Sequence, residues 1–129
     1  MMEITESPGV HLFLYGTLMR GCCGHHRVTN QTFIDNARTI TGYRLYDLTG
    51  FPGLVVEDSD TVGVPGELWK VEADCLERLN RFEGTAVSLY QLAPIRLRPP
   101  FDRFEVLTYL YLHGIIGRDV VIGRWRESK

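Results

Sequence analysis

The stretch Leu14-Tyr15-Gly16-Thr17-Leu18-Met19-Arg20-Gly21 joins a mostly apolar run to a turn that contains glycine. Residues 11–15 have the length and composition of a short β-strand, and Gly16 ends it. Because Gly16 has no side chain, the backbone there can approach a ligand closely, and successive N–H groups in such a turn form a small anion-binding concavity. Taken alone the pattern indicates little, since any tight turn that follows a strand resembles it.

Several strand-like segments follow, separated by turn signals. Many short strands with one or two helices predict an α+β domain built on a curled sheet or a barrel. The chain has 129 residues, which fits a single domain, residues 1–129. Pro65 interrupts one of the segments and suggests an edge strand or a bulge. We expect a helical segment at residues 24–32, and strands at residues 36–41, 43–47, 54–56, 62–71, 90–97, 104–112 and 120–122.

Residues 74–82 form the strongest helical pattern in the chain. Leu76, Leu79 and Phe82 recur on one face, and Gly84 stands where a helix C-cap favours glycine. Glu83 is therefore the last helical residue, where the partial negative charge of a helix C-terminus makes a carboxylate locally unfavourable. This placement suggests a use for Glu83, but without further context a solvated surface glutamate is the simpler interpretation.

Composition excludes several classes of function. The formal net charge is −2, which argues against a broad binding surface for nucleic acid or an anionic membrane. The basic residues near the C-terminus fit a solvated tail; they are Arg118, Arg124, Arg126 and Lys129. The apolar stretches are too short to span a bilayer, and residues 1–8 lack the pattern of a signal peptide. Three cysteines form no even framework, so we expect reduced thiols and a cytoplasmic protein. The oligomeric state stays open.

The run Cys22-Cys23-Gly24-His25-His26 offers thiol and imidazole groups that bind metals elsewhere. Neighbouring side chains diverge, however, and this spacing matches no zinc signature. A loop with incidental thiols is the favoured interpretation, and we expect no metal site. A cysteine nucleophile paired with His25 or His26 is a further alternative with less support.

The order of these segments resembles the γ-glutamylcyclotransferase-like family, and within it the branch of the γ-glutamylamine cyclotransferases, also called AIG2-like. The similarity runs from about His11 to His113. Its opening signature is the stretch from Leu14 to Gly21. It continues through the following segments: Phe51-Pro52-Gly53-Leu54-Val55, Val64-Pro65-Gly66-Glu67-Leu68-Trp69, Leu79-Asn80-Arg81-Phe82-Glu83-Gly84, Tyr90 and Tyr109-Leu110-Tyr111.

The resemblance implies a small mixed β-barrel flanked by a few helices, with a pocket at one end. It implies cyclisation of a γ-glutamyl group to 5-oxoproline with release of an amine or amino acid. Glu83 would be the general acid/base. The backbone of Tyr15, Gly16, Thr17 and Leu18 would hold the substrate α-carboxylate, and Tyr90 would line the site.

By the same resemblance, a small γ-glutamyl molecule is the expected partner, and no cofactor is needed. The alternative is a non-catalytic small-molecule-binding protein on the same fold. Two departures stand out. Asn80 occupies a position where the family commonly has Asp. The loop at residues 22–26 is unusual for the family, and because of this second departure the leaving group stays undetermined.

Overall fold

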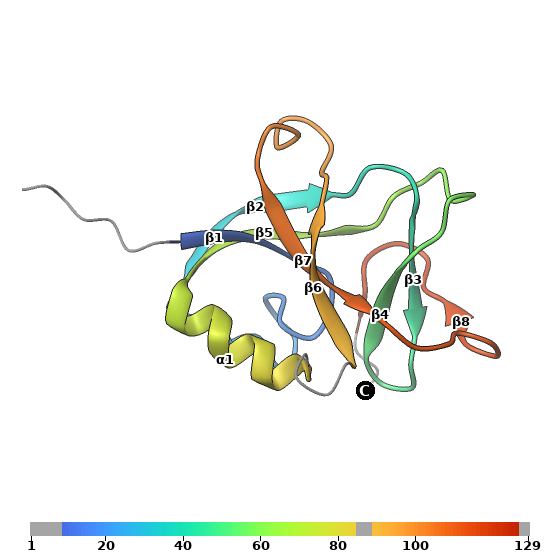
Figure 1. The fold of residues 1–129 in the computed structure, drawn as a ribbon, viewed down its shortest axis with the longest axis horizontal. Coiled ribbons are helices and arrows are strands. Elements are labelled where there is room, and N and C mark those ends of the chain that lie inside the picture. The colour runs from blue at the N-terminus through green and yellow to red at the C-terminus, as the bar shows by residue number, and fades with distance from the viewer. Residues whose placement is uncertain (1–8, 85–88, 127–129) are drawn as a thin grey trace, which may run out of the picture.

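The computed structural model describes residues 9–84 and 89–126, and in these it contains a mixed eight-stranded sheet, one α-helix and one short 3-10 helix (Figure 1). The expected α+β class is confirmed, but the few flanking helices are reduced to α1 (Ala73–Glu83) and η1 (His25–Arg27). The strands are β1 (Gly9–Leu14), β2 (Thr32–Arg38), β3 (Tyr43–Asp47), β4 (Pro52–Val56), β5 (Pro65–Glu72), β6 (Tyr90–Ile95), β7 (Val106–Tyr111) and β8 (Asp119–Val120).

The strands lie in the order β2-β5-β1-β7-β4-β3-β8, with β6 paired to the other side of β7. One edge of β7 serves two partners: its first residues pair in parallel with β1, and Leu110 pairs in parallel with Leu54 of β4. The sheet therefore divides at β7, and the end of β1 and the start of β4 face each other across the division. Both ends contribute to the cavity described below.

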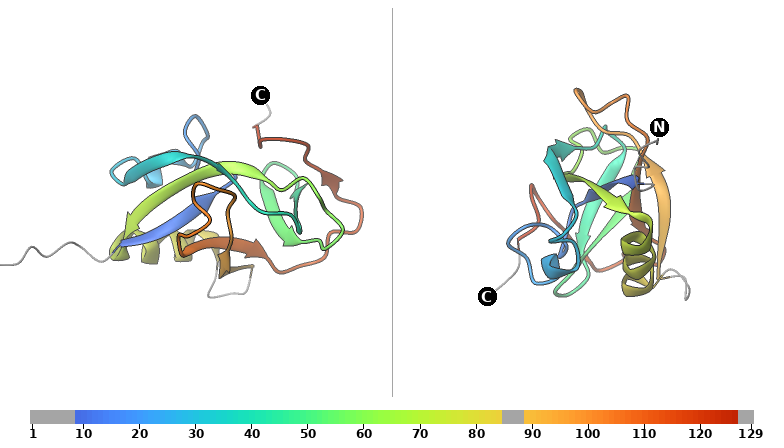
Figure 2. Two further views of the ribbon diagram at one scale, coloured as in Figure 1. Left: turned by 90° about the horizontal axis from the view of Figure 1, so that it is seen from above. Right: turned by 90° about the vertical axis from the view of Figure 1, so that its left-hand side faces the viewer.

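The sheet curls strongly, as Figure 2 shows, but it is not the closed barrel that we expected. In the described residues, β2 and β6 are joined only by an isolated bridge, formed by Thr39 and Leu97 just beyond the two strands. Two further backbone bonds flank the bridge: Ile40 N–H donates to the Arg96 carbonyl, and Arg98 N–H donates to the Arg38 carbonyl. Contact at this single point brings the two edges together without completing a ladder.

β5 lies inside the sheet, so the prediction of an edge strand at Pro65 is wrong. The strand begins at Pro65, where only β2 pairs with it, and β1 joins from Glu67 onward. A proline is compatible with a first strand residue because its missing N–H removes no bond of the second ladder. The irregularity that Pro65 suggested lies in the partner strand, where the register of β2 shifts between Phe33 and Asp35.

The helix expected at residues 24–32 is replaced by η1 and a turn, and β2 already begins at Thr32. The histidine, valine, threonine and asparagine residues of this segment have modest helix propensity, so local preference did not sustain a longer helix. Each of the bonds from Arg27 N–H to Gly24 and from Val28 N–H to His25 spans three residues. The segment remains a compact loop after β1.

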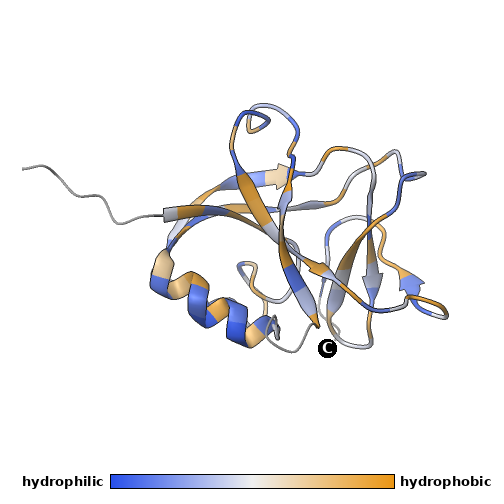
Figure 3. Cartoon of the chain, in the orientation of Figure 1, coloured by the Kyte–Doolittle hydropathy of each residue, from blue (hydrophilic) through white to orange (hydrophobic). Residues whose placement is uncertain are grey.

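α1 packs against β1 and β5 and ends where predicted, with Gly84 in the left-handed conformation at φ 74°. Figure 3 shows hydrophilic and hydrophobic residues alternating around it, as in an amphipathic helix. Its buried side chains are Cys75 and Leu79, whereas Phe82 is 42% exposed, so the predicted apolar face is rotated by about one residue. In the described residues, no helix is long and apolar enough to cross a membrane.

Candidate active site

The turn after β1 forms one wall of a cavity. Gly16 accepts a hydrogen bond from Met19 N–H at 3.0 Å, and Thr17 accepts one from Gly24 N–H at 2.8 Å. A Cβ atom on Gly16 would lie 2.5 Å from Pro52 Cγ, so only glycine lets this turn pack against the start of β4. A larger residue at position 16 would therefore displace the backbone of this turn.

Glu83 reaches the same cavity from the end of α1. The cavity has a volume of about 140 Å³ and is lined by Phe13, Leu14, Tyr15, Gly16, Thr17, Leu18, Phe51, Pro52, Phe82, Glu83, Leu89, Tyr90 and Tyr109. All six site residues predicted from the sequence are in this lining. The expected convergence of Glu83 and the Tyr15–Leu18 turn on one cavity is thus met, although some 65 residues separate them in the sequence.

Burial raises the pKa of Glu83 from 4.5 to about 7, and the nearby positive charge of Arg27 opposes this rise. The lining explains the loss of solvation, since most of it is apolar or aromatic. A carboxyl group with a pKa near 7 can both accept and donate a proton at neutral pH. Because Glu83 lines a cavity that could hold a small ligand, it could exchange a proton with a ligand bound there.

Three tyrosines surround the carboxylate and are held by hydrogen bonds. Tyr15 Oη donates to the Tyr109 carbonyl at 2.6 Å, and Tyr90 Oη donates to the Pro52 carbonyl at 2.9 Å. Burial, and secondarily the charge of Glu83, raises the pKa of Tyr90 and Tyr109. For Tyr15, burial again comes first, with Tyr90 and Glu83 adding to it. All three are therefore neutral near pH 7, and Glu83 carries the acid–base capacity of the group.

Asn80 links the last turn of α1 to β7. Its side-chain oxygen accepts a hydrogen bond from Tyr109 Oη at 2.6 Å. An amide oxygen can accept this bond as a carboxylate would, but it adds no negative charge beside Glu83. The departure from the family pattern at Asn80 thus keeps a contact between helix and sheet. Sequence reasoning missed its partner Tyr109, which was noted only as part of a core strand.

In the loop that contains Cys22 and Cys23, both histidine rings contact backbone carbonyls. His25 Nδ1 lies 3.0 Å from the Leu18 carbonyl, and His26 Nδ1 lies 3.2 Å from that of Cys23. The His25 ring also packs edge-on against Trp69. These contacts hold the loop beside the cavity. Among the described residues, no group of three or more His, Cys, Asp and Glu side chains is arranged to hold a metal ion.

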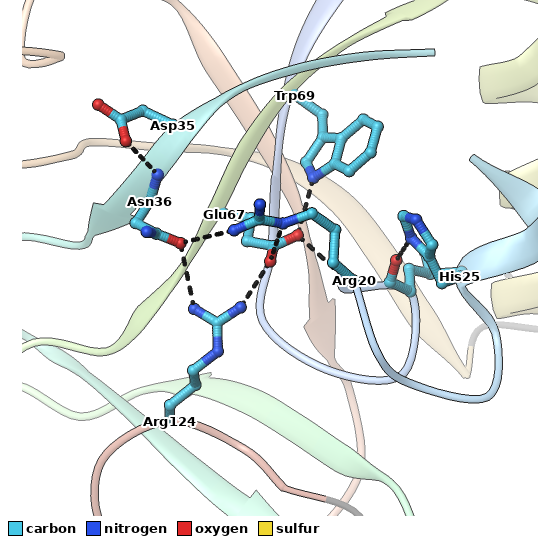
Figure 4. A network of polar contacts seen from close by, with 8 residues as sticks. Arg20, His25, Asp35, Asn36, Glu67, Trp69 and Arg124 are labelled. Atoms are coloured by element: carbon cyan, nitrogen blue, oxygen red, sulfur yellow. Dashed lines mark hydrogen bonds and ion pairs between the residues drawn. The ribbon is translucent and has the colours of Figure 1, made fainter. Parts of the chain in front are cut away.

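A buried polar network that the sequence did not predict lies behind the turn (Figure 4). Glu67 is completely buried in β5, and its carboxylate accepts bonds from Trp69 Nε1, from Arg124, and from both the backbone N–H and the Nε of Arg20. Burial alone would raise the pKa of Glu67, but these hydrogen bonds lower it below its usual value. Arg124, which we interpreted as part of a solvated tail, instead pairs with the centre of the sheet.

The fold and the cavity define a class: an α+β protein whose curled mixed sheet and single described α-helix bring one carboxyl group, with a raised pKa, against a glycine turn. Residues 12–127 match the model of the family described as "Gamma-glutamyl cyclotransferase, AIG2-like". The chain belongs to this family.

Two relatives agree with this assignment, and a solved structure shares the fold. The chain is 34% identical to gamma-glutamylaminecyclotransferase A of Danio rerio (69% of this chain, 59% of the relative). It is 30% identical to the gamma-L-glutamyl-butirosin B gamma-glutamyl cyclotransferase of Niallia circulans (74% and 55%). It therefore spans less than two thirds of the length of either relative. A mouse AIG2-like protein has a similar fold, with a TM-score of 0.70 and 24% identity over 79% of this chain and 76% of that one.

Proposed function

We propose that this protein cyclises a γ-glutamyl group to 5-oxoproline and releases an amine or amino acid, with Glu83 as the general acid/base. The observation that carries the proposal is the cavity itself, in which a carboxyl group with a pKa of about 7 lies against a glycine turn. Family membership and the names of the two relatives support the same reaction class.

The chemistry requires a base that can also act as an acid. The α-amine of the substrate attacks its own γ-carbonyl carbon, which forms the lactam C–N bond and breaks the C–N bond to the leaving group. Glu83 takes a proton from the attacking nitrogen and gives one to the leaving nitrogen, so the carboxylate is regenerated. Because both reacting groups belong to one molecule, holding the substrate chain folded lowers the barrier.

The remaining walls of the cavity would orient the substrate. We assign the α-carboxylate to the backbone N–H groups of the turn from Tyr15 to Leu18, as the family resemblance implies. The hydroxyl hydrogen of Tyr90 is already donated to Pro52, so Tyr90 Oη can only accept a further bond. It would then receive an N–H of the substrate and leave Glu83 available for proton transfer.

The test is Glu83→Gln, which keeps the size of the side chain and removes the proton-accepting carboxylate. We expect the rate of 5-oxoproline release to fall by at least about a hundredfold, the lower end for general acid–base catalysis. Binding of a γ-glutamyl compound should persist, since other residues hold it. Glu77→Gln, on the exposed face of the same helix, is the matched control and should keep wild-type turnover.

Near-wild-type turnover in a folded Glu83→Gln protein would contradict the proposal. Binding of γ-glutamyl compounds by the wild-type protein with no release of 5-oxoproline would instead favour the alternative, a non-catalytic binding protein on this fold.

A further inference from the structure

A second hollow lies beside the cavity, between η1 and α1. It has a volume of about 460 Å³ and is lined by His26, Arg27, Thr29, Asn30, Arg78 and Leu79. This lining includes two guanidinium groups and an imidazole but no acidic side chain. Of these groups Arg78 is paired with Asp74, so the side of the hollow at Arg27 is the part suited to an anionic group.

Arg27 connects the two hollows. Its guanidinium lies 3.8 Å from the centroid of the Phe82 ring, and Phe82 itself lines the cavity that contains Glu83. The Arg27 backbone is held in turn, because its carbonyl oxygen accepts a bond from Cys75 Sγ of α1 at 3.7 Å. A guanidinium stacked on an aromatic face keeps the N–H groups at its edge available for a planar anion.

Arg27 also differs from the arginines of α1. Arg78 and Arg81 each pair with a helix carboxylate four residues earlier, Asp74 and Glu77 respectively. In the described part of the chain, no acidic side chain forms an ion pair with Arg27. Arg27 thus presents a positive charge at the margin of the cavity, within electrostatic reach of Glu83.

We propose that Arg27 binds a carboxylate on the leaving group, so that the substrates are γ-glutamyl derivatives of amino acids or peptides rather than of simple amines or polyamines. This inference rests on the proposed function. If the γ-glutamyl part lies against the turn and its amide lies at Glu83, the neighbouring Phe82 and the Arg27 guanidinium stacked on it are next to the group beyond the amide. A carboxylate there would gain a charge-assisted bond, whereas a cationic amine would be repelled.

The experiment compares γ-glutamylalanine with γ-glutamylethylamine, which differ only in the carboxylate of the leaving group. For the wild type we expect kcat/KM to be about tenfold higher for γ-glutamylalanine, the order of one partly exposed charge-assisted bond. Arg27→Met should lower kcat/KM for γ-glutamylalanine about tenfold and change kcat/KM for γ-glutamylethylamine little. Arg81→Met, which removes a paired arginine from the outer face of α1, should preserve the wild-type preference.

Equal turnover of the two compounds by the wild type, or equal loss of both in Arg27→Met, would overturn the inference and leave the proposed function standing. If neither compound yields 5-oxoproline, the proposed function fails, and calorimetric binding to the Glu83→Gln protein decides the inference separately. Tighter binding of γ-glutamylalanine that Arg27→Met abolishes would support it, and equal binding of the two compounds would overturn it.

Discussion

Glu83 is a residue whose properties come from its surroundings rather than from its own helix. The groups that face it come from four other segments: Arg27 from η1, Tyr15 after β1, Tyr90 from β6 and Tyr109 from β7. The three tyrosines remain neutral near pH 7 because their pKa values are raised. Glu83 is thus the group in this set that changes its charge near neutral pH, and it does so against an apolar lining.

The stability of Glu83→Gln should therefore depend on pH relative to the wild type. The pKa of Glu83 is raised in the folded state from 4.5 to about 7, so the folded protein binds a proton more tightly than the unfolded chain. Below pH 4.5 both states are protonated, and the variant and the wild type should melt at similar temperatures. As the pH rises from 4.5 to about 7, the wild type loses stability that the neutral glutamine keeps.

Thermal unfolding at a series of pH values measures this difference. The excess in Tm of Glu83→Gln should grow across that window and level off above it. An excess that is constant with pH would show that the carboxyl group titrates as it does in an unfolded chain.

At the scale of elements, β5 supports the turn that lines the cavity. Glu67 of β5 receives the Arg20 backbone N–H at 3.2 Å and the Arg20 Nε at 3.0 Å. Arg20 follows the turn directly, and its guanidinium also stacks on Phe33 of β2, 3.7 Å from the ring centroid. The buried carboxylate therefore connects the turn, two strands and, through Arg124, the C-terminal segment.

Glu67→Gln should destabilise the fold and weaken substrate binding together. It leaves two arginines facing a side chain with its own N–H donors, and we expect a loss of about 2–4 kcal/mol in the free energy of unfolding, since one partner of a buried pair is removed. Denaturant unfolding measures this loss. KM for a γ-glutamyl substrate should rise more than kcat falls, because the turn is displaced while Glu83 is kept.

Asn36→Ala is the matched control for this network. Asn36 accepts bonds from both arginines but at its exposed margin, so its loss should cost less than about 1 kcal/mol. A Glu67→Gln protein as stable as Asn36→Ala would mean that the buried carboxylate does not hold the turn.

At the scale of the whole molecule, the central strands β1 and β5 approach each other closely at Gly66. A Cβ atom on Gly66 would lie 2.3 Å from the Leu14 carbonyl oxygen and 2.7 Å from Phe13 Cζ. The first of these atoms belongs to the backbone and cannot rotate away. Because Leu14 immediately precedes the turn, this contact positions the cavity wall as well as the central strands.

Gly66→Ala should accordingly cost about 2–3 kcal/mol in the free energy of unfolding, towards the upper part of the range for overpacked cores. Gly114→Ala is the control, since a Cβ atom there would meet no atom within 4 Å. Its effect on the free energy of unfolding should be within about 0.5 kcal/mol of zero. A Gly66→Ala protein with wild-type stability would show that β1 and β5 can separate without loss.

The α+β class, the α1 helix with its Gly84 cap, and the turn after β1 were all predictable from the sequence. These features depend on short-range preferences: an apolar repeat, the conformational freedom of glycine, and turn residues at strand ends. Six of the thirteen residues that line the cavity were also predicted, through the family resemblance. The roles of those residues stay a proposal that the Glu83→Gln test addresses.

Only the tertiary structure decided the interior position of β5, the open sheet and the Glu67 network. Pro65 looked like an edge residue because the sequence does not show that β1 joins β5 only from Glu67 onward. Arg124 looked like part of a solvated tail because its partner Glu67 lies 57 residues earlier. Desolvation and ion pairing depend on residues that are distant along the chain and close in space, and local patterns carry no information about them.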